Sequence, residues 1–276
     1  MSVVWLNGCL SAAADARISP FDHGLIVGDG VFETIRVYAG RPFALLRHLD
    51  RLERSAAGIG LAAPPRLQLE QAVAEVISAN PDVPEARLRL TVTSGPGPLG
   101  SRRGEEPPTV LAAVAPIPPL RPSYAVAVSP WPRNERGPLA GLKTVSYAEN
   151  AMVLAWARQL GGDEAIFPNL AGNLCEGTGT NVFVGVGGRL VTPPLSAGCL
   201  AGVTRDLVID LTDAVEADSP ISALADADEA FVTGTGCEVM PIATVDGTPV
   251  RQCPGPLTAA AQQAFRALIA NPPAEL

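Results

Sequence analysis

The chain of 276 residues has very little lysine: one residue, Lys143, stands against nineteen arginines. It also has only two histidines, His23 and His48, and five cysteines. Two histidines far apart leave few ways to build a zinc site, so we expect no metal, and a Ser-His-Asp mechanism would depend on one of them. The cysteines form no CxxC pair and their number is odd, which disfavours a disulfide framework and favours the cytoplasm.

Long apolar runs and an excess of positive charge are missing too. No apolar stretch reaches the roughly 18 residues that span a bilayer, and the N-terminal residues lack the basic start and apolar stretch of a signal peptide. A net charge of −8 disfavours non-specific binding to nucleic acid or anionic lipid. The apolar fraction of 47% is typical of a folded protein. We therefore expect an acidic cytoplasmic protein with no nucleic-acid or membrane partner.

Strand and helix patterns mix without a strict strand–helix–strand alternation, which predicts an α+β or mixed α/β fold. Residues 116–122 are rich in proline, and we expect them to link two domains, 1–115 and 123–276. Hydrophobic spacing predicts the elements. Helices are expected at 44–61, 66–80, 148–162, 202–215 and 257–270, and strands at 3–11, 30–43, 86–95, 124–131, 164–169, 181–194 and 229–250.

The single lysine lies in GLKTVSYAEN, residues 141–150. A guanidinium stays protonated in proteins, whereas an ε-amine can lose its proton when desolvated and form a Schiff base with a carbonyl. Composition alone leaves two alternatives open. Lys143 is either a chance survivor in a chain that uses arginine, or it occupies a position that requires an amine.

Three segments could bind an anion. Gly202–Thr204 stands at the expected start of a helix, where free N–H groups suit a phosphate. Thr233–Cys237 is a glycine turn after a strand and offers amides and a hydroxyl. Arg47 and Arg51 stand four residues apart on one helical face, and His48 stands three residues before Arg51, in reach of the same ligand. Each is weak alone, because such glycines are usually simple turns and helical arginines are usually solvated.

Glu176, in CEGTGTNVFV, stands next to an apolar strand, where an unpaired carboxylate would be costly. A carboxylate against a pyridine nitrogen would keep that ring protonated and strengthen it as an electron sink. An ordinary turn glutamate would produce the same local pattern, so both interpretations stay open.

Taken in order, these segments resemble the class IV aminotransferases, which are fold-type IV pyridoxal-phosphate enzymes. The matching motifs are GDGVFETIRV (28–37), HLDRL (48–52), LKTVSYAEN (142–150), EGTGTNVF (176–183), GCLAGVTRD and GTGCEVMPI. The resemblance implies a small N-terminal α/β domain and a larger C-terminal pseudo-barrel domain that binds pyridoxal 5'-phosphate. It also implies a homodimer in which the loop 95–106 lies near the neighbour's active site.

The same resemblance implies roles for single residues. Lys143 matches the lysine that forms the Schiff base and moves the proton, and Glu176 matches the acid on the pyridine nitrogen. Arg51 matches the arginine that binds the phosphate. The other implied cofactor-binding residues are His48, Tyr147, Val203, Thr204 and Thr235, and the implied substrate-binding residues are Phe32, Thr34 and Gly236.

The substrate is harder to predict. Branched-chain enzymes usually have a glycine where FETIR has Thr34, and the best-known D-amino acid transaminases have an Arg-x-His carboxylate trap in the loop after TVT. Here that loop reads SGPGPLGSRRG, with Arg102 and Arg103 displaced, although either could still reach a carboxylate. We expect a transaminase that moves an amino group from a D-amino acid or (R)-amine donor to a 2-oxo acid.

Several alternatives stay open. Aminodeoxychorismate lyase is the first, because it too has threonine at the Thr34 position, and a branched-chain aminotransferase is the second. A non-catalytic member of the fold is disfavoured, because Lys143, Glu176 and Arg51 are all present. A nucleophilic hydrolase has no GxSxG elbow or Cys/His pairing to support it.

Overall fold

The computed structural model describes residues 2–273 and 276 of the chain. These residues form two compact units. Unit 1 contains the described residues up to Pro118 and the segment Leu142–Tyr147, and unit 2 contains Pro119–Gly141 and Ala148–Pro273. The domain ranges expected from the sequence stay a prediction. The structure adds that the segment with the single lysine packs with unit 1, although it lies far along the chain.

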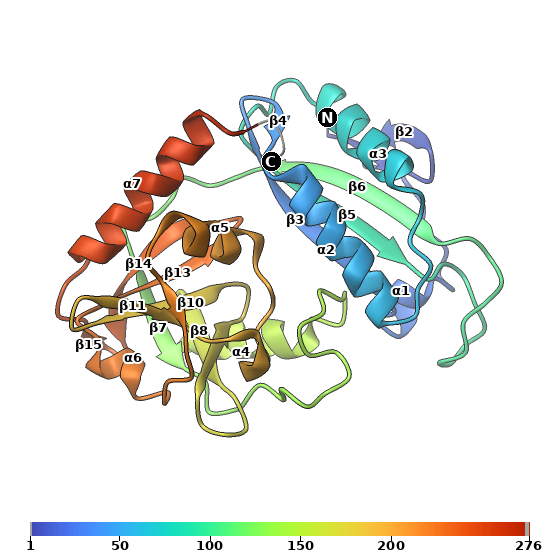
Figure 1. Ribbon diagram of the computed structural model, residues 1–276. Helices are drawn as coiled ribbons and strands as arrows, with labels where there is room; N and C mark the ends of the chain where they lie inside the picture. Colours follow the sequence, from blue (N-terminus) through green and yellow to red (C-terminus); the bar gives the residue numbers. More distant parts are fainter. Residues whose placement is uncertain (1, 274–275) are drawn as a thin grey trace. The chain divides into compact units, whose positions relative to one another are not determined.

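Unit 1 is a six-stranded sheet in the order β2-β1-β6-β5-β3-β4. Helices α2 and α3 pack on the sheet and contact β3, β6 and β1 (Figure 1). The elements are β1 (Val3–Leu6), β2 (Cys9–Ala12), α1 (His23–Ile26), β3 (Gly30–Tyr38), β4 (Arg41–Pro42), α2 (Leu45–Gly58), α3 (Arg66–Ser78), β5 (Ala86–Thr93) and β6 (Thr109–Pro116).

Residues of β3 alternate between the two faces of this sheet. Val31 and Ile35 are fully buried in the core that the strands form with α2 and α3. Because side chains alternate along a strand, Phe32 and Thr34 lie on the opposite face. β3 pairs with β5 so that Thr34 stands directly opposite Arg89. This register decides which side chains of the two strands share a face.

Unit 2 contains a nine-stranded sheet that runs β12-β11-β10-β13-β14-β7-β8-β9, with β15 paired to β14. Strand β9 also pairs with β10, so the six strands from β10 to β9 close on themselves. The expected pseudo-barrel and the mixed α/β class are therefore confirmed. The elements are β7 (Tyr124–Val128), α4 (Ala148–Gln159), β8 (Glu164–Pro168), β9 (Leu174–Gly177), β10 (Asn181–Val186), β11 (Arg189–Thr192), the 3₁₀ turn η1 (Leu195–Ala197), α5 (Val203–Leu211), β12 (Val215–Glu216), α6 (Ala223–Asp226), β13 (Glu229–Gly234), β14 (Glu238–Val245), β15 (Thr248–Pro249) and α7 (Pro256–Ala270).

The two faces of β10 and β13 are both apolar. Val182 and Val232 belong to one buried core, and Phe183 and Phe231 lie on the other face with their rings stacked at 4.8 Å. Helices α5 and α7 contact β13 and each other, so these strands are buried on both sides. This explains why NVFV and AFV are continuous apolar runs rather than alternating ones.

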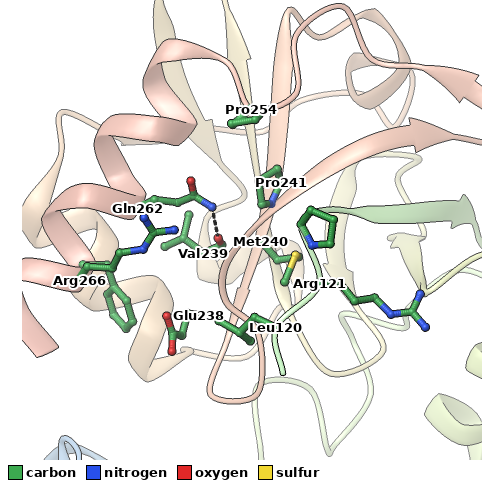
Figure 2. Close-up of a pocket in the computed structure, with 11 residues that line it drawn as sticks. Leu120, Arg121, Glu238, Val239, Met240, Pro241, Pro254, Gln262 and Arg266 are labelled. Atoms are coloured by element: carbon green, nitrogen blue, oxygen red, sulfur yellow. Dashed lines mark hydrogen bonds between the residues drawn. The ribbon is translucent and has the colours of Figure 1, made fainter. Parts of the chain in front are cut away.

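A small cavity of about 180 Å³ lies in unit 2 between β14 and α7 (Figure 2). Gln262 at its edge donates a hydrogen bond to the Val239 carbonyl oxygen at 3.0 Å. None of the residues predicted for the site lines this cavity. Among the described residues, no helix is long and apolar enough to cross a membrane. Within the same part of the chain, no three His, Cys, Asp or Glu side chains are grouped as metal ligands would be.

Candidate active site

The backbone of Lys143 is fixed on two sides within unit 1. Its carbonyl oxygen accepts a hydrogen bond from the Phe32 amide on β3 at 3.1 Å. Its own amide donates to the Ser55 hydroxyl on α2 at 3.1 Å. The lysine is thereby attached to the strand that carries the FETIR motif and to the helix that carries Arg51.

The Lys143 side chain is enclosed by aromatic groups and only 9% exposed. Its Nζ atom lies 4.4 Å from the centre of the Phe32 ring and 3.4 Å from the Tyr147 hydroxyl. The Phe32 and Tyr147 rings meet edge to face at 5.0 Å. The structure thus brings together three of the residues that the sequence predicted.

Two other predicted residues, His48 and Arg51, converge on a residue that the sequence argument did not select. Glu33 on β3 is fully buried. Its Oε1 accepts from Arg51 Nε at 2.8 Å, and its Oε2 accepts from Arg51 Nη2 at 2.7 Å. The same Oε2 lies 2.7 Å from His48 Nδ1. This two-point ion pair holds the Arg51 guanidinium in one orientation.

The charges in this cluster follow from its burial. Burial alone would raise the pKa of Glu33, but the charge of Arg51 and the hydrogen bonds from Arg51 and His48 lower it to about 2. Burial also lowers the pKa of His48 below its ordinary value, against the opposing influence of Glu33. At neutral pH the cluster is therefore a carboxylate and a guanidinium beside a neutral imidazole.

The sheet face that carries Phe32 also carries arginines. Arg89 is exposed overall, but its Cζ atom lies 3.6 Å from the centre of the Phe32 ring. Desolvation at this position lowers the pKa of Arg89 from its ordinary value. Lys143 and Arg89 therefore contact the same aromatic ring, so an amine and a guanidinium lie close together within unit 1.

A second arginine on this face is buried. Arg36 stands directly opposite Arg87 on the paired strand, and it is 9% exposed. Its Nη2 lies 3.4 Å from Glu85, whereas Nε and Nη1 are buried and have no hydrogen-bond partner among the described residues. Like charges directly opposite on paired strands destabilise a sheet. An anion bound between Arg36 and Arg87 would offset this repulsion and could accept from the buried nitrogens of Arg36.

The remaining predicted residues lie in unit 2, where Glu176 is held on both of its oxygens. Its Oε2 accepts a hydrogen bond from the Leu200 amide at 2.9 Å. Its Oε1 lies 3.2 Å from Nε of Arg133. On the sheet, Glu176 stands opposite Phe167 of β8 and Asn181 of β10. The acid is thus a strand residue rather than a turn residue.

Helix α5 begins as the sequence predicted, with Gly202 as its N-cap and with Val203 and Thr204 buried in its first turn. No side chain caps this end, and the first amides of a helix have no acceptor within the helix. A Cβ atom at Gly202 would lie 2.0 Å from Oδ1 of Asn181, so a larger residue here would have to displace the Asn181 side chain. The result is an open helix N-terminus, which suits an anion.

The turn between β13 and β14 carries Thr235 and Gly236, both partly buried. A neighbouring residue, Thr233, is 1% exposed, and its hydroxyl has no hydrogen-bond partner among the residues that the structure describes. Thr233 stands directly opposite Asn181, the residue that abuts Gly202. A buried hydroxyl without a partner therefore lies close to the start of α5, in addition to the Thr235 hydroxyl that we expected there.

The loop 95–106 is attached to unit 1 by one of its two arginines. Arg103 donates from Nε and Nη2 to the Asp29 carboxylate at 2.6 and 2.7 Å, and from Nη2 to the Ile59 carbonyl oxygen at 2.8 Å. Arg102 is exposed. Because Arg103 is engaged with Asp29, it does not replace the Arg-x-His carboxylate trap in this arrangement.

The sequence contained a signal for the residues that the motif argument missed. In VFETI, Glu33 occupies a core position between Val31 and Ile35, which marks it as a buried acid that needs a partner. In RLRL, the alternation places Arg87 and Arg89 on one face of the strand. Thr233 gave no such signal, because its buried hydroxyl follows from the barrel pairing.

The model of the family described as amino-transferase class IV matches residues 30–245 of the chain. That span is most of the sequence, and it includes the lysine segment, the Glu176 strand and the start of α5. The chain belongs to the class IV aminotransferase family, and its cofactor is pyridoxal 5'-phosphate.

The proteins to which the chain is similar are named for different activities. A Methanocaldococcus jannaschii protein with the provisional name branched-chain-amino-acid aminotransferase is 37% identical, over 88% of each chain. Aminodeoxychorismate lyase of Bacillus subtilis is 31% identical over 98% of this chain and 95% of its own. D-alanine aminotransferase of Bacillus licheniformis is 32% identical over 95% of both. A crystal structure of the branched-chain aminotransferase from Thermoproteus uzoniensis superimposes with a TM-score of 0.91 at 32% identity, covering 100% of this chain and 97% of the other.

The residues present suit this cofactor. Within unit 1, an enclosed amine and a fixed guanidinium are available for a carbonyl and a phosphate. Within unit 2, an open helix N-terminus and the buried Thr233 hydroxyl suit a phosphate, and a doubly held carboxylate suits a ring nitrogen. When bound, pyridoxal 5'-phosphate supplies an aldehyde for Schiff-base formation and a ring that accepts electrons.

Proposed function

We propose that this aminotransferase takes its amino group from a D-amino acid and transfers it to a 2-oxo acid, with Lys143 as the residue that forms the Schiff base. The observation that carries the proposal is the set of arginines on the sheet face of unit 1 that also holds Phe32. Such a face recognises a carboxylate. It therefore favours an amino acid over a simple (R)-amine as the donor.

Lys143 would do two things in this reaction. Its Nζ atom would first hold the cofactor through the Schiff base. After the substrate has released this amine, Nζ would take the proton from the substrate's Cα and deliver it to the carbon of the cofactor. The Tyr147 hydroxyl at 3.4 Å would orient this amine, and the Phe32 ring at 4.4 Å would shield it from water. Within unit 1, Arg51, oriented by Glu33, would bind the phosphate.

The arginines on this sheet face would bind the substrate carboxylate, which the Arg-x-His motif binds in the best-known D-amino acid transaminases. Two buried nitrogens of Arg36, Nε and Nη1, have no hydrogen-bond partner among the described residues, and Arg87 and Arg89 lie on the neighbouring strand. A carboxylate bound by two guanidinium groups gains charge-assisted hydrogen bonds and relieves the repulsion between the arginines. Thr34, directly opposite Arg89, would then face the part of the substrate next to the carboxylate.

The D configuration rests on Thr34 and on the D-alanine aminotransferase relative. The same threonine favours aminodeoxychorismate lyase, and a lyase relative matches over 98% of the chain, so the lyase is the alternative. A branched-chain L-amino acid is the second alternative, supported by the Methanocaldococcus relative and the Thermoproteus structure.

We further infer a homodimer. Phe21, Leu25 and Leu99 are apolar and between 51% and 75% exposed. Phe21 and the loop 95–106 are joined by a hydrogen bond from the Gly97 amide to the Phe21 carbonyl oxygen at 3.0 Å, so these apolar groups belong to one region of unit 1. Burial against a second copy would remove this apolar surface from water. The cytoplasmic location expected from the cysteine usage stays part of the proposal.

Half-reactions separate the candidates. The holoenzyme would be mixed in turn with D-alanine, L-leucine and (R)-1-phenylethylamine, and the change in the cofactor spectrum would be followed. An assay for released 4-aminobenzoate would run beside it. We expect the fastest change with D-alanine. A faster change with L-leucine, or release of aminobenzoate without amino transfer, would replace the proposal with the corresponding alternative.

A further inference from the structure

Arg133 is the centre of a set of contacts in unit 2 that ends at Glu176. Its backbone amide donates to the Pro168 carbonyl oxygen at 2.7 Å, which attaches the loop after β7 to the end of β8. Its Cζ atom lies 4.1 Å from the centre of the buried Phe167 ring. Its Nη1 donates to Glu149 at 2.5 Å and lies 3.3 Å from Oδ1 of Asn150 on α4. The guanidinium plane is therefore fixed from several sides.

The remaining edge of this guanidinium faces Glu176. Nε of Arg133 lies 3.2 Å from Oε1 of Glu176, and both side chains are 13% exposed. The other oxygen of Glu176 accepts the hydrogen bond from the Leu200 amide. Leu200 lies in the loop that leads directly into α5. Glu176 thus stands between a fixed cation and the loop that positions the helix N-terminus.

The contacts of Glu176 affect the charge and the orientation of its carboxylate. A buried carboxylate is costly unless a partner compensates its lost hydration, and here a neighbouring cation does so. The ion pair with Arg133 and the hydrogen bond from the Leu200 amide restrict the orientation of the carboxylate, and a carboxylate oxygen can accept from more than one donor. A protonated ring nitrogen is such a donor.

We propose that Arg133 is a positioning residue for the reaction. It keeps Glu176 ionised and in the one orientation in which its carboxylate can accept a hydrogen bond from the pyridine nitrogen of the cofactor. This inference rests on the proposed function, because it assumes that Glu176 meets that nitrogen. It assigns Arg133 no contact with the substrate.

The test uses three variants in the full chain. Arg133→Gln removes the charge, and Arg133→Lys keeps the charge but cannot serve Glu149 and Glu176 together. Arg136→Gln is the matched control, because Arg136 is 81% exposed and its nearest acid, Glu135, lies 3.9 Å away.

Two readouts are measured for each variant. The first is the titration of the Glu176 carboxyl in the cofactor-free protein by ¹³C NMR, with the signal assigned by comparison with Glu176→Gln. We expect Arg133→Gln to move this titration to higher pH by about one unit. The second is steady-state kinetics of the holoenzyme, where we expect kcat to fall about tenfold or more with KM nearly unchanged. Arg133→Lys should lie between wild type and Arg133→Gln, and Arg136→Gln should match wild type.

Two results would overturn the inference: a carboxyl titration in Arg133→Gln that equals that of Arg136→Gln, or an unchanged kcat. If Arg133→Gln does not fold, the neutral variant Arg133→Met takes its place, and wild-type values of both readouts in that variant would remove Arg133 from the role. Failure of the proposed function looks different. In that case the wild-type protein itself would show no Lys143-dependent colour with pyridoxal 5'-phosphate.

Discussion

Glu33 and Arg51 form a two-point ion pair inside unit 1, with Oε1 accepting from Nε at 2.8 Å and Oε2 from Nη2 at 2.7 Å. Glu33 is fully buried, and Arg51 is 5% exposed. The pair joins β3 to α2. It therefore serves the core and the proposed phosphate site at once.

Removing one partner of this pair should be costly for the fold. Glu33→Gln removes the buried carboxylate that pairs with Arg51, and we expect the free energy of unfolding to fall by about 3 kcal/mol or more. Urea denaturation of the cofactor-free protein measures this. Arg51→Ala should in addition weaken the affinity for pyridoxal 5'-phosphate more than for pyridoxal, which lacks the phosphate. Equal losses for both compounds would remove Arg51 from the phosphate site.

The same cluster predicts how stability depends on pH. The pKa of Glu33 is about 2 in the folded chain against an ordinary value of 4.5, so its contribution is complete above pH 4.5 and is lost as the pH falls toward 2. It amounts to about 3 kcal/mol. His48 has a lowered pKa when folded, so below about pH 6.5 the unfolded chain takes up a proton that the folded chain does not.

Both groups act in the same direction, and stability should fall on acidification, first through His48 and then through Glu33. Urea unfolding at a series of pH values measures this. In His48→Gln the loss between pH 6.5 and 5 should be smaller than in wild type. An identical slope in that range would contradict the role given to His48.

Lys143 predicts a single site of covalent trapping. Borohydride reduction of the coloured holoenzyme should attach the cofactor at Lys143, because the chain has no other lysine, and peptide mass mapping checks the position. Lys143→Arg should lose the coloured band and all but a trace of turnover, because a guanidinium does not form a Schiff base. Undiminished turnover in Lys143→Arg would refute the central role of this residue.

The arginine face predicts a change that depends on the substrate. Arg87→Gln should raise KM for an amino acid donor about tenfold, the loss expected for a charge-assisted hydrogen bond. It should leave the reaction with (R)-1-phenylethylamine unchanged, because that amine has no carboxylate. Arg41→Gln, an exposed arginine on β4, is the control. If both donors respond equally to Arg87→Gln, this face does not bind the carboxylate.

A substitution at Gly202 should weaken the binding of the cofactor's phosphate group specifically. A Cβ atom there would lie 2.0 Å from Oδ1 of Asn181, so Gly202→Ala should shift the Asn181 side chain and the first turn of α5 away from each other. We expect weaker binding of pyridoxal 5'-phosphate, by about tenfold, with little change for pyridoxal. Fluorescence titration of the cofactor-free protein measures both affinities, and unchanged binding of the phosphate would exclude the start of α5 from the site.

Much of the fold was predictable from local patterns. The long helices α2, α3, α4, α5 and α7 lie where helical spacing placed them, because their apolar stripes extend over several turns. The expected strands did not include β6 (Thr109–Pro116), and the short elements α1, α6 and β9 were missed as well. Elements of four residues carry too little periodicity to be recognised, and they form because tertiary contacts hold them. Strand β9 matters most, because it carries Glu176.

The sequence by itself determined the chemistry: one amine, one acid in a glycine-rich motif and one arginine in HLDRL, in the order of a known family. Only the tertiary structure decided which partners these groups have. That Glu33 holds Arg51, that Arg133 faces Glu176 and that Arg36 and Arg87 oppose each other all follow from strand register and helix packing. Residues far apart along the chain come into contact only when the strands pair and the helices pack, and a local sequence pattern does not determine those contacts.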